Sequence, residues 1–224
     1  GSLDIYIKFD YSSGIALSLN LLGNAARYLG QYTEAEKLHQ QVLQTCQALN
    51  YPLGVTLASY SLGYLAHLVG DQVEAKRWLS ASLETAKKLA YPHGLIRSLN
   101  ALGKVASALG EYQKAKAYLH EALKVTQKVQ AVPMILEVLT SLADLLIKEG
   151  RTAQAMELLT FSLNHAASKK ETRDKANCLF AELAAKLPGP VIAATQEKGK
   201  AGKLEERVAE ILTQKRGEEV LVVC

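Results

Sequence analysis

The sequence has few of the residues on which covalent or metal-centred chemistry depends. Only three cysteines occur in 224 residues, and the wide spacing of Cys46, Cys178 and Cys224 excludes a disulfide framework and a CxxC metal pair. We therefore expect a reducing, cytoplasmic environment. The five histidines form no HExxH pair, so neither a metal nor another cofactor is expected.

Long apolar runs, strong charge and catalytic motifs are missing too. No run approaches the roughly 20 residues of a membrane-spanning helix, so no membrane partner is expected. A formal net charge of +4 is too weak to indicate nucleic acid. Residues 197–203, EKGKAGK, resemble a phosphate-binding loop, but Glu197 and Leu204 stand where that motif needs Gly and Ser or Thr. No GxSxG signature occurs, and the sequence predicts a noncatalytic protein.

What the sequence does contain is an internal repeat of 40 residues. The repeated columns are Leu22-Gly23, Leu62-Gly63, Leu102-Gly103 and Leu142-Ala143; Gly30, Gly70, Gly110 and Gly150; Ala35, Ala75, Ala115 and Ala155; and Leu43, Leu83, Leu123 and Leu163. Each copy predicts two helices that turn at the glycine of the second column, and Tyr11, Tyr51 and Tyr91 mark the joints between copies. The leucine columns, Leu22 included, predict the core.

Other residues of the copies have simpler expected roles. Gly23 and Ala35 are small where the two helices of a hairpin would cross, which lets the backbones approach closely. Trp78 is expected to pack between helices. We expect His39 and His120, on second helices, to be partly buried or exposed, and Cys46 to be a packed or exposed thiol rather than a nucleophile.

This pattern resembles the tetratricopeptide repeat. The residues that match are the small residue after leucine (Gly23, Gly63, Gly103 and Ala143), the early tyrosine of the second helix (Tyr32 and Tyr112), and the alanine column from Ala35 to Ala155. The family's period of 34 is shorter, and its aromatic residue at the start of the first helix is missing. The resemblance implies an all-α, right-handed superhelical solenoid of antiparallel helix hairpins.

The repeat phase divides the chain into four parts. Residues 11–170 hold the four 40-residue repeats. Residues 1–10 alternate like a strand, but they align with residues 81–90, so we expect a helix from Leu3 to Phe9 that is the remnant of a preceding repeat, and an array that continues upstream. Residues 171–215 are a partial fifth repeat with capping helices, because a solenoid end needs its apolar face covered. Residues 216–224 are a tail whose last residues favour a strand.

The segment at 187–212, LPGPVIAATQEKGKAGKLEERVAEIL, resembles the end of repeat arms in bacterial STAND-type NTPase and LuxR-type regulators. The matching residues are Gly199, Leu204, Glu205, Glu206, Val208 and Ala209. The resemblance implies a sensing arm that controls an attached output domain in signal transduction or transcription regulation.

First helices line the concave face of such arrays, and the resemblance carries the groove positions onto this chain. The candidate binding residues are Asn20, Asn24, Arg27, Tyr28, Tyr60, Tyr64, His67, Arg97, Asn100, Lys104, Glu137 and Asp144, with Leu68, Ser107, Thr140 and Lys148 beside them. Tyr60 and Tyr64, one turn apart, predict a platform for stacking or apolar contact. A solvated groove with no ligand remains the alternative.

Two functions follow. The first is a noncatalytic protein–protein interaction or sensing module that binds a peptide or partner domain in this groove. The alternative is a receptor for a small-molecule inducer in the same groove. RNA binding is disfavoured by the period and the weak net charge. We also expect that an array cut from a longer protein can pair through its exposed cut end, so that a homodimer of this chain would be an artefact of the cut.

Overall fold

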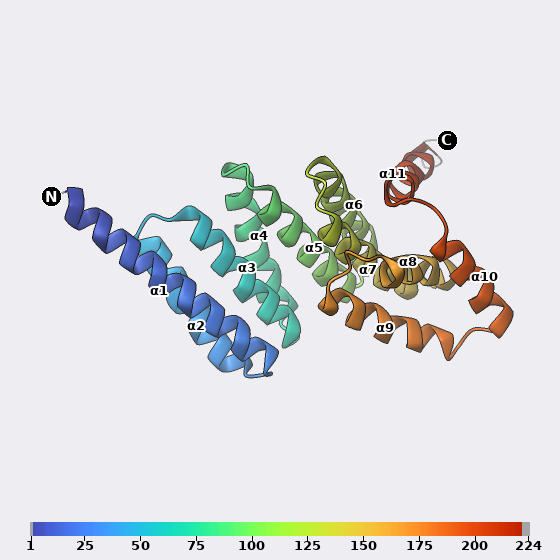
Figure 1. Cartoon of the computed structure of the whole chain (residues 1–224), viewed down its shortest axis with the longest axis horizontal. Coiled ribbons are helices and arrows are strands. Elements are labelled where there is room, and N and C mark those ends of the chain that lie inside the picture. Colours follow the sequence, from blue (N-terminus) through green and yellow to red (C-terminus); the bar gives the residue numbers. More distant parts are fainter. Residues whose placement is uncertain (1, 221–224) are drawn as a thin grey trace. The chain divides into compact units, whose positions relative to one another are not determined.

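The computed structural model describes the backbone of residues 2–220 and the side chains of residues 14–213 (Figure 1). All regular structure in this part of the chain is α-helix, arranged as successive hairpins. The prediction of an all-α fold of antiparallel helix hairpins is therefore confirmed. The chain divides into two compact units, residues 1–105 and 106–224, and each is described by itself.

Unit 1 contains the first hairpins. Its helices are α1 (Ser2–Tyr28), α2 (Tyr32–Ala48), α3 (Pro52–Leu68), α4 (Gln72–Lys88) and most of α5 (Pro92–Ala108). Helices α2 to α5 have 17 residues each, and α3, α4 and α5 each begin 20 residues after the helix before. Two helices and two short turns therefore make up each 40-residue repeat.

The turns within and between hairpins use the same backbone geometry. Gly70, inside the second hairpin, has a φ of +91°, and Ala90, between hairpins, has a φ of +47°. After each of them a backbone N–H closes the helix end, as when Tyr91 donates to the carbonyl of Ala86 at 2.9 Å. The sequence predicted the glycine turns and the joints at Tyr51 and Tyr91, but it did not predict the left-handed residue before each of these tyrosines.

Helix α1 differs from the predicted pattern. The predicted helix from Leu3 to Phe9 is confirmed, but the joint predicted at Tyr11 is wrong, since α1 runs without interruption from Ser2 to Tyr28. The reason is local. Ser12 stands where Pro52 and Pro92 begin the later first helices, and serine does not force the preceding residue out of the helical region. The origin of residues 1–10 as a repeat remnant stays a prediction.

The leucine columns form the core of unit 1, with one exception. Leu62 is 4% exposed and packs with Val42, Leu43 and Cys46 of α2, and Trp78 lies against the same cluster. The predicted burial of Leu22 is wrong, because this side chain is 57% exposed. Leu62 is covered by the hairpin before it, whereas no helix in the described residues covers the equivalent side of α1.

The second-helix histidines also depart from expectation. His39 is 1% exposed and His120 is 3% exposed, so both are buried rather than partly buried or exposed. Cys46 is a packed thiol, 1% exposed, and burial raises its pKa. A thiol held protonated in this way is a poor nucleophile.

Unit 2 contains the remaining helices. They are α6 (Tyr112–Lys128), α7 (Val132–Lys148), α8 (Thr152–Asn164), α9 (Lys170–Ala184), α10 (Gly189–Lys200) and α11 (Leu204–Val220). Helix α8 packs against α7, α9 and α10, while α11 packs against α6, and Leu204 and Val208 of α11 are buried. Residues 171–215 are mainly helical, and their assignment as a partial fifth repeat with capping helices stays a prediction. The tail predicted from residue 216 begins as helix, since α11 continues to Val220, and residues 221–224 lie outside the described residues.

Across the described residues, no helix combines the length and the apolar character that crossing a membrane requires.

Candidate partner-binding surface

Two tyrosines of α3 form the centre of the candidate surface in unit 1. The rings of Tyr60 and Tyr64 are stacked, with centroids 5.9 Å apart and planes 9° from parallel. Both residues are half-buried. One helical turn separates them, so their side chains leave the same face of α3. The predicted platform is therefore present as a geometric feature.

Cations from the two neighbouring first helices lie against these rings. The guanidinium carbon of Arg97, on α5, is 4.5 Å from the ring centroid of Tyr60, and that of Arg27, on α1, is 5.3 Å from Tyr64. Lys104 Nζ, also on α5, lies 5.8 Å from the Tyr64 centroid. We call Arg27, Tyr60, Tyr64, Arg97 and Lys104 the tyrosine–cation cluster. It joins α1, α3 and α5 on one surface.

Charge on this surface has one sign. The first helices of unit 1, taken over residues 14–28, 52–68 and 92–108, contain no Asp or Glu. The carboxylates of the same stretch of chain stand on the second helices, as with Glu34 and Glu74, where they pair with Lys37 and Arg77. Residues 14–28, 52–68 and 92–108 therefore bring positive charge and no carboxylate to this surface.

The other candidates in unit 1 are placed differently. Asn20 and Asn24 are half-buried on α1, and Tyr28 is 65% exposed with the Arg27 guanidinium 4.1 Å from its ring centroid. The Nδ1 atom of His67 lies 2.7 Å from Gln72 Oε1, which ties it to the α3–α4 turn. Asn100 is 3% exposed. Its side chain belongs to the packed interior of unit 1, and we remove it from the candidate surface.

The candidates in unit 2 are held by local contacts. Lys148 Nζ lies 3.3 Å from an oxygen of Asp144 and donates to Ser107 Oγ at 3.0 Å. Thr140 is 4% exposed and donates to the Leu136 carbonyl. Glu137 is half-buried. Lys148 therefore joins Asp144 of α7 to Ser107 of α5, while Thr140 bonds within α7, so these four side chains make contacts within the fold.

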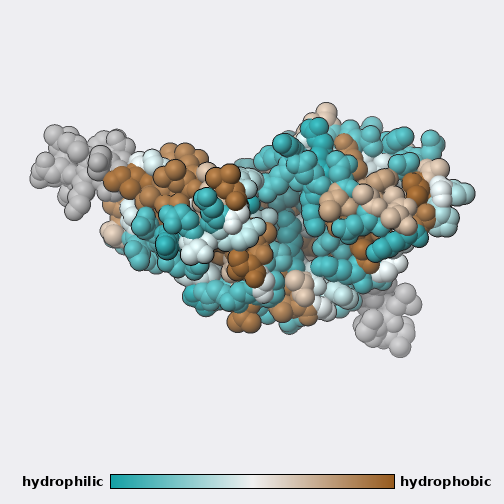
Figure 2. Space-filling model, turned by 90° about the horizontal axis from the view of Figure 1, so that it is seen from below, coloured by the Kyte–Doolittle hydropathy of each residue, from teal (hydrophilic) through white to brown (hydrophobic). Residues whose placement is uncertain are grey.

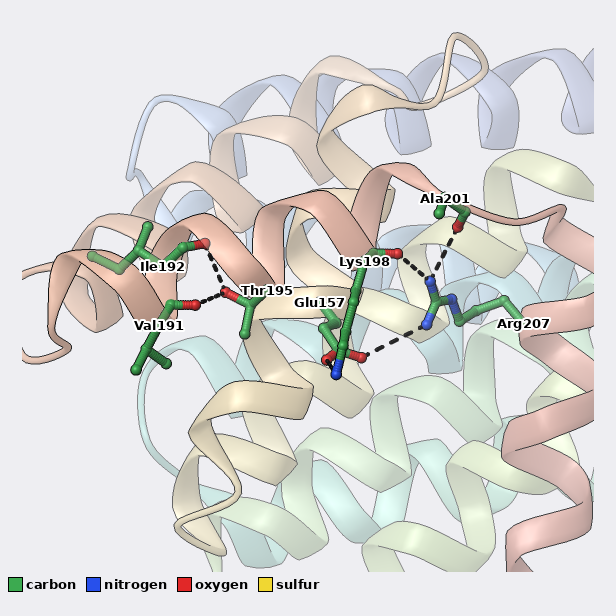
Figure 3. A network of polar contacts seen from close by, with 7 residues as sticks. All are labelled: Glu157, Val191, Ile192, Thr195, Lys198, Ala201 and Arg207. Atoms are coloured by element: carbon green, nitrogen blue, oxygen red, sulfur yellow. Dashed lines mark hydrogen bonds and ion pairs between the residues drawn. The ribbon is translucent and has the colours of Figure 1, made fainter.

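A second polar cluster in unit 2 has a structural role (Figure 3). It borders a surface hollow of about 280 Å³. Arg207 donates to the carbonyls of Lys198 at 2.8 Å and Ala201 at 3.2 Å, and its guanidinium lies 3.8 Å from Glu157 of α8. Lys198 approaches the other oxygen of Glu157 at 3.8 Å. Arg207 thus fastens the turn between α10 and α11 to α8, and its charge is used within the fold.

The hairpins repeat, and their small residues stand at the same position in each copy. These two features define a protein of the helical-hairpin repeat class. Two overlapping matches to the family model for the tetratricopeptide repeat cover residues 13–88 and 55–128, together just over half of the chain. The chain therefore belongs to the tetratricopeptide repeat family. Proteins of this family generally mediate protein–protein interaction and are typically noncatalytic.

Solved structures agree with this assignment at the level of the fold. The crystal structure of BtubC (BKLC) from P. vanneervenii aligns with 95% of this chain and 92% of that chain, with a TM-score of 0.58 and 15% sequence identity. An identity this low shows a shared fold and nothing about a shared partner. No curated protein matches the chain.

Proposed function

We propose that this chain is a protein-interaction module and that the first-helix surface of unit 1 binds an acidic segment of a partner protein. The observation that carries the proposal is the tyrosine–cation cluster, in which three cations surround two stacked rings. Residues 14–28, 52–68 and 92–108 of the first helices contain no Asp or Glu, so this surface favours an acidic partner over a basic one.

The side chains suit a segment that carries both carboxylates and apolar groups. A guanidinium that stacks on a ring uses its face, while carboxylates bind along its N–H edge, often through two parallel hydrogen bonds. Tyr60 and Tyr64 offer apolar ring surface with little conformational entropy to lose on binding. Stacking also holds Arg97 in place before a partner arrives, which reduces the entropic cost of binding.

The wider role as the arm of a bacterial regulator rests on the resemblance of residues 187–212 alone. In the structure several of these residues serve packing. A Cβ added at Gly199 would lie 2.7 Å from the carbonyl oxygen of Glu157, and Leu204 and Val208 are 8% and 1% exposed. The docking of α10 and α11 thus accounts for these three residues. The role as a regulator arm and the binding of a small-molecule inducer are hypotheses from the sequence.

Selection from a random peptide library tests the proposed function while the partner is still unidentified. The full chain is immobilised, and bound peptides are recovered at low and at physiological salt. We expect the enriched peptides to be rich in Asp and Glu and to bind more weakly at the higher salt. Enrichment of neutral or basic peptides, or of none, would contradict the proposal.

A variant pair locates the binding surface. The double variant Arg97→Gln with Lys104→Gln removes two cations of the cluster, and we expect it to lose the acidic peptides. Lys37→Gln removes a cation from α2, where its side chain is 66% exposed and 3.9 Å from Glu34, and we expect it to retain them. Equal retention by both proteins would place binding elsewhere.

A further inference from the structure

His67 continues the line of side chains that begins with the two stacked tyrosines. Tyr60, Tyr64 and His67 follow one another at spacings of four and three residues on α3, so the three side chains leave the same face of the helix. His67 is half-buried. The equivalent residue 40 positions earlier is Arg27, whose guanidinium lies against Tyr64. On α3, a histidine therefore stands at the position from which α1 brings a permanent cation to the surface.

A side-chain contact determines which ring nitrogen of His67 carries the hydrogen. Its Nδ1 atom lies 2.7 Å from Oε1 of Gln72, and Gln72 Nε2 lies 3.5 Å from the backbone carbonyl oxygen of His67. The second contact orients the amide so that its oxygen faces the ring. A carboxamide oxygen can only accept, so Nδ1 donates. The neutral ring is then the Nδ1–H tautomer, and Nε2 is the atom that takes up a proton.

The elements around α3 bring two cations to this part of the surface. The charged groups at the corresponding ends of α1, α2, α4 and α5 are Arg27, Glu34, Asp71, Glu74 and Lys104. The three carboxylates have partners close by in their own stretch of chain, namely Lys37, Arg77 and the backbone N–H of Glu74. Arg27 and Lys104 lie 5.3 and 5.8 Å from the ring centroid of Tyr64, one turn before His67. A proton on His67 adds a third positive charge here, and a carboxylate bound nearby favours the charged ring.

We propose that His67 makes the binding of the acidic segment depend on pH, because protonation of its ring adds a positive charge to the first-helix surface and strengthens binding. The inference rests on the proposed function and adds a regulation of the same surface. His67 is the only residue of α3 whose side chain ordinarily changes charge between pH 8 and pH 5.5. Asp and Glu of a partner titrate at about 3.9 and 4.3, so they stay charged over this range.

The apolar surface of unit 1 provides a contrast. Hydrophobic residues gather at the N-terminal end of unit 1 (Figure 2), where Leu17 and Leu21 of α1 are each 60% exposed. No charged residue occurs between Gly14 and Ala26. A partner bound there meets no group of this stretch whose charge changes between pH 8 and pH 5.5. An affinity that depends on pH through His67 therefore distinguishes binding beside α3 from binding on this apolar surface.

Titration of a selected acidic peptide into the full chain at pH 8.0 and pH 5.5 tests the proposal. We expect the wild-type chain to bind about threefold or more tightly at pH 5.5, at constant ionic strength. His67→Gln keeps a polar side chain that cannot become charged, and its two affinities should be equal. His93→Gln is the matched control, because His93 is an exposed histidine of α5, and it should keep the wild-type ratio. Circular dichroism verifies the fold of each protein at both pH values.

Calorimetry in two buffers with different ionisation enthalpies measures the linked proton directly. If protonation strengthens binding, then binding must also cause proton uptake, because the coupling is reciprocal. At pH 6.5 we expect the wild-type chain to take up protons when it binds the peptide and His67→Gln to take up none. A purely structural role of His67 in the α3–α4 turn could change the affinity of the variant, but it would not produce proton uptake.

The outcomes separate this inference from the proposed function. Equal wild-type affinities at the two pH values, with the acidic peptide still bound, would overturn the role of His67 and leave the proposed function intact. The same holds if His67→Gln keeps the wild-type pH dependence. A selection that yields no acidic peptide would overturn both. Nitrogen chemical shifts of the neutral His67 ring test the geometry without any peptide: we expect the Nδ1–H tautomer, and an Nε2–H tautomer would contradict the proposal.

Discussion

The imidazole of His39 occupies the space that a side chain at Gly23 would need, where α1 and α2 cross. A Cβ added at Gly23 would lie 2.8 Å from His39 Cε1 and 2.9 Å from Nε2. His39 is 1% exposed, and neither ring nitrogen has a hydrogen-bond partner among the described residues. The equivalent residues 40, 80 and 120 positions later are Leu79, Leu119 and Leu159, and each is at most 1% exposed. His39 is thus a polar residue in a leucine position.

Replacing His39 by leucine should stabilise unit 1. A buried polar group without a hydrogen bond costs about 1–3 kcal/mol, and Leu79 packs against Gly63 in the same way, so a leucine fits opposite this glycine. We expect His39→Leu to raise the free energy of unfolding by about 1–2 kcal/mol at neutral pH, measured by urea denaturation. His93→Leu, at an exposed position of α5, is the control and should change it little. A lower urea midpoint for His39→Leu would contradict this account of the crossing.

Acid should destabilise the wild-type chain through the same residue. Burial, and then the nearby charge of Arg27, lower the pKa of His39 from 6.5 to about 4. Between these values the unfolded chain binds a proton that the folded chain does not, so stability present above pH 6.5 is lost as the pH falls toward 4. The loss amounts to about 3 kcal/mol when complete.

Urea midpoints at several pH values between 7.5 and 4.5 measure this effect. Other groups titrate in the same range, so the informative quantity is the difference between wild type and His39→Leu. We expect the advantage of the variant to grow as the pH falls. Parallel pH profiles for the two proteins would show that His39 does not contribute.

Close packing at the second hairpin gives another prediction. A Cβ added at Gly63 would lie 2.7 Å from Leu79 Cγ and 3.0 Å from the Leu79 backbone nitrogen. The backbone cannot yield as a side-chain tip can, so Gly63→Leu should reduce stability by roughly 1–3 kcal/mol. Gly14→Leu is the control, because nothing lies within 4 Å of a Cβ at that position. Equal melting temperatures for Gly63→Leu and wild type would refute the packing assignment.

The sequence predicted features that recur with the repeat. The 40-residue period fixed the hairpins, the left-handed glycines and the burial of Leu62, Leu83 and Leu102, because each copy places these residues in the same surroundings. It also brought Tyr60 and Tyr64 together, since residues four apart share a helix face.

Features that depend on one copy alone were not predicted. Leu22 has the residue type of its column, but no hairpin among the described residues covers it. His39 is buried, whereas histidine is usually at least partly exposed. The leucines at the equivalent positions of the other copies did indicate a buried position. The contacts of Arg27 and Arg97 with the rings of α3 depend on how neighbouring helices pack, and spacing within one helix does not determine that.

Binding of an acidic peptide by matched double variants tests the central claim most directly. A peptide recovered by the selection is titrated into the wild-type chain, into Arg97→Gln with Lys104→Gln, and into Lys37→Gln with Lys88→Gln, which removes the same charge from second helices. Loss of two cluster cations should weaken binding about tenfold or more, while the second-helix variant should stay within about twofold of wild type. Equal affinity for the two double variants would contradict the assignment of the first-helix surface as the binding site.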